Sequence, residues 1–283
     1  MQDVRPSPIA GAWYPGDPDK LKASVDAQLE AAQIPTLEDE IVGVIAPHAG
    51  HRYSGAVAAH AFRCLKGLDP TVVAVISPMH QPHEGRLCTT DHRAYATPLG
   101  EIPVDHTLIE ELESNLDPQL GLTIERIRFD QEHSLEIELP FLQRVLRTPF
   151  RLLPLMLRDQ TRTTCEDVGH ALAAVLRSKS YILVASSDLS HFKSDAVARQ
   201  LDAFMLERIE AFDPIGILDA EEHKLGYACG KGAMAATLWA AKDLGATDVK
   251  VLSYANSGDV TGDLYSVVGY GAAVITRSYE PRR

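Results

Sequence analysis

The sequence predicts an α/β fold, a single domain over residues 1–283 with a largely parallel central sheet flanked by helices. Short, continuous, β-branched runs alternate with helical patterns over most of the chain, which is typical of α/β proteins. The composition, 45% hydrophobic and 23% charged, is ordinary for a globular protein. No internal repeat and no Pro/Gly/Ser-rich linker divides the chain, and 283 residues can bury a large core without disulfides or a structural metal.

Six segments are predicted strands. Residues 41–46, 72–76 and 181–185 are short apolar runs of the kind that is buried on both faces of a covered, largely parallel sheet. Residues 152–157 are a weaker candidate, because Pro154 indicates an edge strand or a bulge. Two further strands are expected near the C-terminus, at residues 250–254 and 266–275. The strand order does not follow from the sequence.

Helices are predicted between these strands. Asp17 and Pro18 suit an N-cap and a first turn, and Leu21, Val25 and Leu29 continue as one apolar stripe. Residues 132–146 also have a helical pattern, in which Ser134 and the acidic residues suit a first turn. The remaining predicted helices are 54–65, 166–177, 195–209 and 232–244.

Charge and cysteine content limit the function classes. The net charge is −12 and the pI is near 5.3, which disfavours non-specific binding to nucleic acid or to anionic membranes. No run approaches the ~20 apolar residues of a membrane span, and the N-terminus lacks the apolar centre of a signal peptide. Four cysteines without a C-x-x-C pair are expected to be free thiols in a reducing cytoplasm; they are Cys64, Cys88, Cys165 and Cys229.

Residues of catalytic type follow three of the predicted strands. In chain order they are His48, His51, Tyr53, His80, His83, Asp188 and His191. Ligands in open α/β sheets bind beyond the carboxyl ends of the strands, so a shared pocket is expected. Taken alone, each histidine is more simply a turn residue, and His51 and His83 are expected to be supporting or exposed. Ser187 and Asp188 could instead cap a helix.

Cys229 lies just before the predicted helix 232–244, between glycines that permit close backbone approach. The helix dipole at this position is expected to lower the pKa of the thiol and to favour the thiolate, which binds metals or acts as a nucleophile. The alternative is a small apolar packing residue. Residues 11–14 form an aromatic turn around Trp13 that suits either the core or a pocket wall.

Six motifs in order resemble the Memo family, which includes AmmeMemoRadiSam system protein B. They are GAWYPG at 11–16, APHAGHRYSG at 46–55, SPMHQPH at 77–83, EHSLEIELP at 132–140, SSDLSH at 186–191 and ACGKG at 228–232. The family fold is similar to that of class III extradiol dioxygenases, which are non-haem iron enzymes, so the resemblance implies an extradiol-dioxygenase-like fold.

The resemblance also implies roles for individual residues. His48, His80 and Cys229 correspond to the metal ligands proposed for the family, and Asp188 and His191 correspond to residues of catalytic type in the same pocket. Trp13, Tyr53 and His133 are expected along the wall of the substrate pocket, and Trp13 matches a position linked to peptide binding. Two departures stand out: extradiol enzymes have a carboxylate where this chain has the thiol, and Lys231-Gly232 replaces a basic-His-Pro continuation of the mammalian family member.

The expected cofactor is a metal ion, with Fe(II) first and Cu or Zn as alternatives, because imidazole suits all three and thiolate favours Cu(I) and Zn. Asp188 could complete a face of two histidines and one carboxylate, with His191 as proton acceptor. Three functions stay open. One is a metal-dependent redox enzyme or oxygenase, and another is a peptide- or protein-binding accessory protein, for which the resemblance implies radical-SAM and AMMECR-type partners. The third is a hydrolase with Cys229 as nucleophile.

Overall fold

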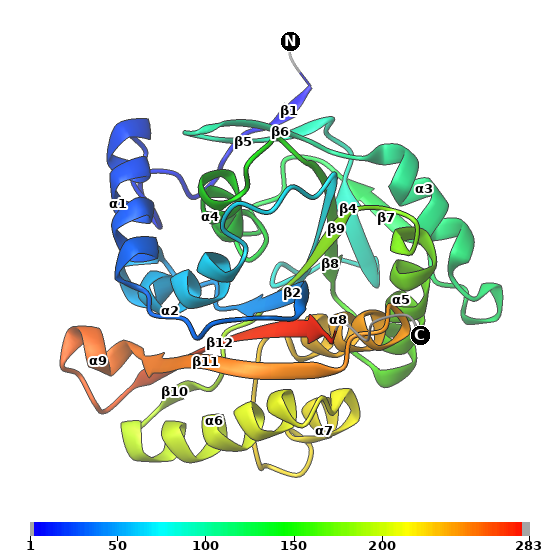
Figure 1. The fold of residues 1–283 in the computed structure, drawn as a ribbon. Coiled ribbons are helices and arrows are strands. Elements are labelled where there is room, and N and C mark those ends of the chain that lie inside the picture. The colour runs from blue at the N-terminus through cyan, green and yellow to red at the C-terminus, as the bar shows by residue number, and fades with distance from the viewer. Residues whose placement is uncertain (1–2, 279–283) are drawn as a thin grey trace.

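The computed structural model describes residues 3–278. Among them, a nine-stranded sheet has the order β10-β12-β2-β9-β3-β8-β4-β7, with β11 paired to β12 (Figure 1). Its strands are β2 Glu40–Ala46, β3 Val72–Pro78, β4 Leu87–Thr90, β7 Ile124–Ile127, β8 Arg151–Leu157, β9 Tyr181–Ser186, β10 His191–Lys193, β11 Asp248–Asn256 and β12 Val267–Arg277.

The predicted α/β fold is confirmed, and the sheet is mixed. Strands β2, β9, β3 and β8 run parallel to one another, as their continuous apolar runs predicted. Strand β12 is antiparallel to β2, β10 and β11, and β4 is antiparallel to β8. The edge strand or bulge expected from Pro154 is wrong, because β8 lies between β3 and β4 and pairs with β3 without a register shift. The ladder to β4 pairs only Met156 and Leu157, so the proline lies before that ladder begins.

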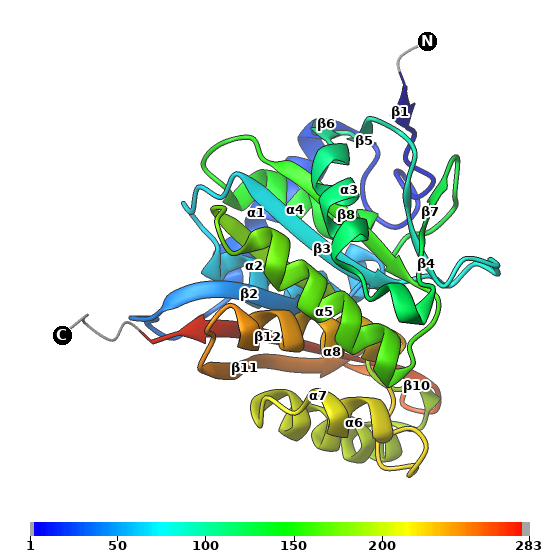
Figure 2. The same cartoon turned by 90° about the vertical axis from the view of Figure 1, so that its right-hand side faces the viewer.

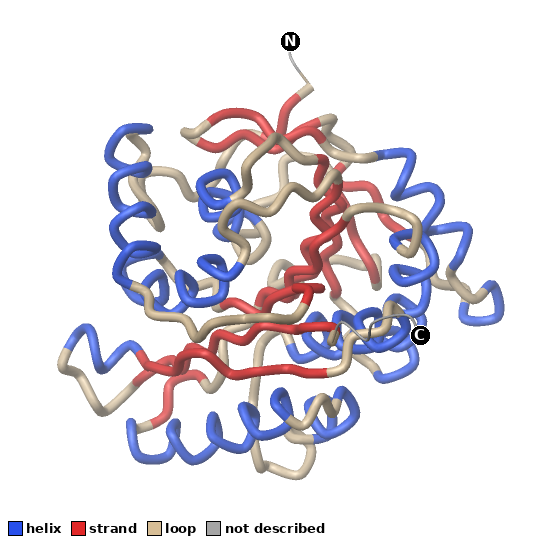
Figure 3. The backbone as a smooth tube through the Cα atoms, viewed as in Figure 1, coloured by secondary structure: helices blue, strands red, loops and turns tan. Residues whose placement is uncertain are grey.

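Helices cover both faces of the sheet (Figure 3). Helix α2 packs on β2, β11 and β12, α8 packs on β3 and β9, and α6 lies on the face of β11 and β12 opposite α2 (Figures 1 and 2). The helices are α1 Pro18–Ala31, α2 His51–Cys64, α3 His106–Asn115, α4 Leu139–Val145, α5 Arg162–Leu176, α6 Asp195–Glu210, α7 Pro214–Asp219, α8 Lys231–Asp243 and α9 Ser257–Thr261.

Two helix predictions need correction. The segment from Glu132 does not start a helix: a 3₁₀ turn occupies Glu136–Glu138 and α4 follows, because the Glu132 carboxylate binds the backbone N–H groups of the next two residues and Pro140 fits only the first turn of a helix. Ser187 and Asp188 cap no helix, since α6 begins at Asp195. The expectation of one domain over residues 1–283 stays a prediction.

A small second sheet lies at the top of Figure 1. It has the order β1-β5-β6 and consists of β1 Val4–Arg5, β5 Ala94–Thr97 and β6 Gly100–Pro103. These strands, like β4, β7 and β10, are too short to produce a periodicity in the sequence. None of the helices within residues 3–278 is long and apolar enough to cross a membrane.

Candidate metal centre

Three chain segments meet beyond the carboxyl ends of the central parallel strands. His48 follows β2, His80 follows β3, and Cys229 lies two residues before α8. Each offers one ligand atom, and the three atoms lie within 4.8 Å of one another. The Sγ atom of Cys229 is 3.1 Å from Nε2 of His48. The three residues therefore form a group that could hold a metal ion.

The tautomer of His48 follows from its partners. Its Nδ1 is 2.8 Å from the Ser186 hydroxyl, which in turn donates a hydrogen bond to the backbone oxygen of Ser134 at 2.6 Å. Because this hydroxyl donates its only proton to a carbonyl, it must accept a hydrogen bond from Nδ1–H of His48. Burial, with the nearby His133 and His80, lowers the pKa of His48 well below its ordinary value. His48 is thus a neutral imidazole whose Nε2 lone pair faces Cys229.

His80 is oriented by Glu132, which lies 52 residues away in the sequence. One oxygen of Glu132 lies 2.9 Å from Nδ1 of His80, and the other accepts the backbone N–H of His80 at 2.6 Å. Burial alone would raise the pKa of Glu132, but the bond from His80 and the N–H of Ser134 lower it overall. The ionised carboxylate holds the proton of His80 on Nδ1, which leaves Nε2 for a metal, as in carboxylate–histidine–metal triads.

Cys229 is buried, and the expected lowering of its pKa is wrong. Helix α8 begins only at Lys231, and burial together with the nearby Asp188 raises the pKa of the thiol. A bound cation would oppose this effect, since metals favour the deprotonated thiol. The turn is held by Gln160, whose side chain donates to the Cys229 carbonyl and accepts the N–H of Gly232. Gly230 is required here, because a Cβ atom would lie 2.4 Å from the backbone carbonyl oxygen of Ser186.

Asp188 lies against the group. Its Oδ1 accepts the backbone N–H groups of His48 and Ala49, at 2.8 and 3.3 Å, and its Oδ2 is 4.0 Å from Nε2 of His48. Burial raises the pKa of Asp188 to about 7 despite these bonds. His191 begins β10; its Nε2 is buried and has no hydrogen-bond partner among residues 3–278. Burial and the charge of His80 lower its pKa.

A family model described as Memo-like protein matches residues 5–274, a span that contains every residue of this site. The chain belongs to the Memo family. The chain is 35% identical to a MEMO1 family protein of Nitrosopumilus maritimus over 274 residues, which cover 95% of this chain and 98% of the relative. MEMO1 family proteins of Methanopyrus kandleri and Methanosarcina barkeri are 34% and 36% identical, with 95% and 96% of this chain covered and 98% and 100% of the relatives. The family predicted from the six motifs is confirmed.

The open side of this Memo-family site is aromatic. The His133 ring stacks on His80, with centroids 4.7 Å apart, and the Trp13 ring lies 4.2 Å from His133. The side chain of His80 is 32% exposed, whereas His48 and Cys229 are buried. The group is therefore open to solvent on the side of His80. Tyr53 is partly exposed beside Arg52 and takes no part in the hydrogen bonds of the site within the described residues.

The other strand-end histidines stay outside the ligand group. His51 is buried, and its Nε2 lies 3.0 Å from the Ile137 carbonyl. It therefore ties the start of α2 to the segment that contains Ile137. His83 is exposed and accepts the N–H of Gly85. Sequence reasoning missed Glu132 and Ser186 as partners of the two imidazoles. A second group, His80 with Glu132 and His133, also has ligand atoms within 4.8 Å, but four N–H groups already bind the Glu132 carboxylate.

Proposed function

We propose that this Memo-family chain holds one metal ion through His48, His80 and Cys229, and that it is a metal-dependent oxidoreductase acting on a small molecule. The observation that carries the proposal is the hydrogen bonding of the two imidazoles: Ser186 and Glu132 each occupy Nδ1, so that both Nε2 atoms are free for the same ion. Two imidazoles and a thiolate leave room for a further ligand in a four-coordinate or larger shell.

The proposed ion is Fe(II), with Cu and Zn as alternatives. Imidazole with a carboxylate suits non-haem iron, and thiolate suits Cu(I) and Zn; the Asp188 oxygen that lies 4.0 Å from His48 Nε2 is the feature that favours iron. A redox metal would supply electron exchange with a substrate or O₂. We assign proton handling to Asp188 and His191, because Asp188 is buried, His191 is half-buried, and the buried Nε2 of His191 has no hydrogen-bond partner within residues 3–278.

Anaerobic purification with elemental analysis tests the site. We expect about one metal ion per chain in the wild type, loss of the metal in His48→Ala and Cys229→Ser, and full occupancy in His83→Ala, which removes an exposed histidine outside the group. O₂ consumption or substrate turnover should disappear in the first two variants. A wild-type protein that takes up neither Fe, Cu nor Zn after reconstitution would refute the proposal.

The second candidate is an accessory protein that binds a peptide or a protein partner. The exposed Trp13 ring beside His133 favours it, and the family resemblance suggests radical-SAM and AMMECR-type proteins as partners. Binding that survives removal of the metal and is lost in Trp13→Ala would support this role. A hydrolase with Cys229 as nucleophile has less support, because burial raises the pKa of the thiol.

A further inference from the structure

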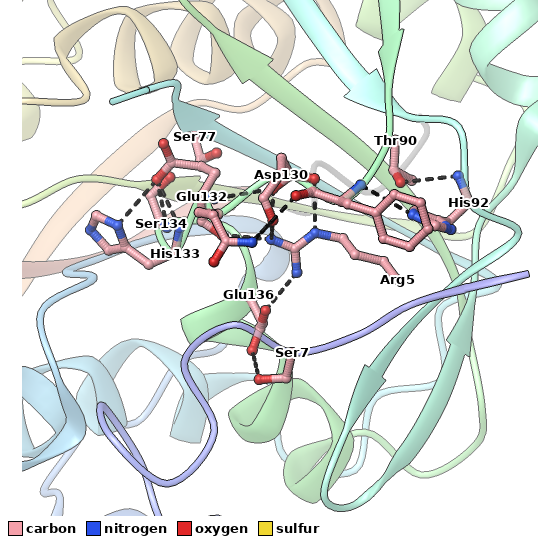
Figure 4. Close-up of polar contacts among 12 residues, drawn as sticks. Arg5, Ser7, Ser77, Thr90, His92, Asp130, Glu132, His133, Ser134 and Glu136 are labelled. Atoms are coloured by element: carbon pink, nitrogen blue, oxygen red, sulfur yellow. Dashed lines mark hydrogen bonds and ion pairs between the residues drawn. The ribbon is translucent and has the colours of Figure 1, made fainter. Parts of the chain in front are cut away.

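A buried polar network outside the ligand group surrounds Arg5 on β1 (Figure 4). Arg5 is 1% exposed, and its Nε and Nη2 donate to the two carboxylate oxygens of Asp130 at 2.9 and 2.6 Å. Its Nη1 donates to Glu136 at 2.6 Å, and Nη2 also donates to the backbone oxygen of Glu132 at 2.7 Å. We call Arg5, Asp130 and Glu136 the Arg5 clamp.

The clamp binds both the backbone N–H and the backbone carbonyl of Glu132. Asp130 accepts the backbone N–H of Glu132 at 3.1 Å, and Arg5 binds the backbone carbonyl of the same residue. Both backbone polar groups of Glu132 are therefore fixed by the clamp, while its side chain extends to His80. The N-terminal segment adds further ties, since the hydroxyls of Ser7 and Tyr14 both donate to Glu136.

The chemistry of the clamp suits positioning better than stability. Burying an arginine between carboxylates costs desolvation energy, and well-packed apolar residues are often as stable at such places. A guanidinium, however, presents five donors in a planar fork, and here it joins two carboxylates and one carbonyl of the segment 130–136. Lysine offers one point charge and cannot reproduce this geometry.

We infer that Arg5 is a positioning residue of the metal centre: it fixes the backbone of Glu132, so that the Glu132 carboxylate holds the Nδ1 proton of His80 and aims Nε2 at the ion. This inference rests on the proposed metal site. Within residues 3–278 the clamp makes no hydrogen bond to His48 or Cys229, so its direct effect is on His80.

Titration with Co(II), a spectroscopic probe for the site, tests the inference. The variants are Arg5→Lys and Asp130→Asn, with Glu132→Gln as the reference. Arg144→Lys is the matched control, because Arg144 makes a bidentate pair with Asp26, at 2.7 and 2.9 Å, between α4 and α1. We expect Co(II) affinity to fall about 10–100-fold in the first three variants, as for other residues that orient metal ligands, and to change less than about twofold in the control.

The absorption spectrum distinguishes positioning from loss of structure. With Co(II) at saturation, the thiolate-to-metal band from Cys229 should persist in Arg5→Lys, while the ligand-field bands shift because His80 is misaligned. If Arg5→Lys does not fold, Asp130→Asn carries the test alone, since Arg5 then keeps Glu136 as its counter-ion.

Two results would overturn the inference while the metal site stands. One is wild-type affinity and spectrum in Arg5→Lys and Asp130→Asn alongside weakened binding in Glu132→Gln. The other is an equal loss of affinity in Arg144→Lys, which would indicate general destabilisation. A wild-type protein that binds no Co(II), or binds it without a thiolate band, would instead refute the proposed site and the inference with it.

Discussion

Replacing Ser186 with alanine tests whether the tautomer of His48 controls metal binding. The Ser186 hydroxyl is fully buried and makes two bonds, one to Nδ1 of His48 and one to the Ser134 carbonyl. Without the Ser186 hydroxyl, the proton on Nδ1 of His48 loses its hydrogen-bond acceptor. The imidazole can then move its proton to Nε2, the atom that faces Cys229 at 3.1 Å, and so lose the lone pair that a metal needs.

The expected magnitudes have two parts. Loss of a group that orients a metal-bound histidine typically weakens metal binding 10–100-fold, which is about 1.4–2.8 kcal/mol. Separately, the Ser134 carbonyl loses its donor, and a buried group left without a partner costs about 1–3 kcal/mol of folding stability. Ser186→Ala should therefore bind metal more weakly and unfold at a lower urea concentration than the wild type.

Thr89→Val is the matched control. Thr89 is also fully buried, and its hydroxyl also donates to a backbone carbonyl, that of Pro154, at 2.6 Å. We expect a similar loss of stability in urea but unchanged affinity when metal dissociation constants are measured by chelator competition. The tautomer argument is refuted if folded Ser186→Ala binds metal within about twofold of the wild type.

Three further predictions concern the surroundings of the site. Burial lowers the pKa of His51 to about 4; because the unfolded chain takes up the proton near pH 6.5, stability should fall by about 3 kcal/mol as pH drops from about 6.5 to 4. In urea melts of the metal-free proteins, the free energy of unfolding should fall less steeply between pH 6.5 and 4 in His51→Gln than in the wild type. Gly230→Ala places a methyl group 2.4 Å from the backbone carbonyl oxygen of Ser186 and should cost about 1–3 kcal/mol of folding stability, with weaker metal binding by chelator competition. Metal at about 100 times its Kd should stabilise the wild type by about 2.7 kcal/mol, seen as a higher Tm, and His48→Ala should abolish the increase.

The central strands and the family could be predicted from the sequence because their signals are local. The runs that become β2, β3 and β9 are continuous and β-branched, and parallel pairing brings the residues that follow them to one edge of the sheet. The predicted approach of His48 and His80 depends only on this rule. Their role as ligands stays a prediction until metal binding is measured.

The residues that orient the ligands could not be predicted in this way. Glu132 lies 52 residues from His80 and Arg5 lies 125 residues from Asp130. Glu132 begins a segment with an ordinary helical pattern, and Asp130 lies just before it. Cys229 shows a different limit. The helix dipole is a local effect that the sequence reveals, whereas burial, which raises the pKa of the thiol, depends on the whole fold.

The balance of buried charge supports the proposal that this site holds a cation. Among residues 3–278, Arg5 is the buried basic side chain of the Lys/Arg type, and its partners are Asp130 and Glu136. The other buried carboxyl groups are Glu132, Glu138, Asp188 and Asp202. Burial raises the pKa of Asp188 and Glu138, because an ionised carboxyl in a dry interior is costly without a positive partner. An ion held by the three ligands would supply that positive charge beside Asp188, so metal binding and ionisation of this carboxyl should favour each other.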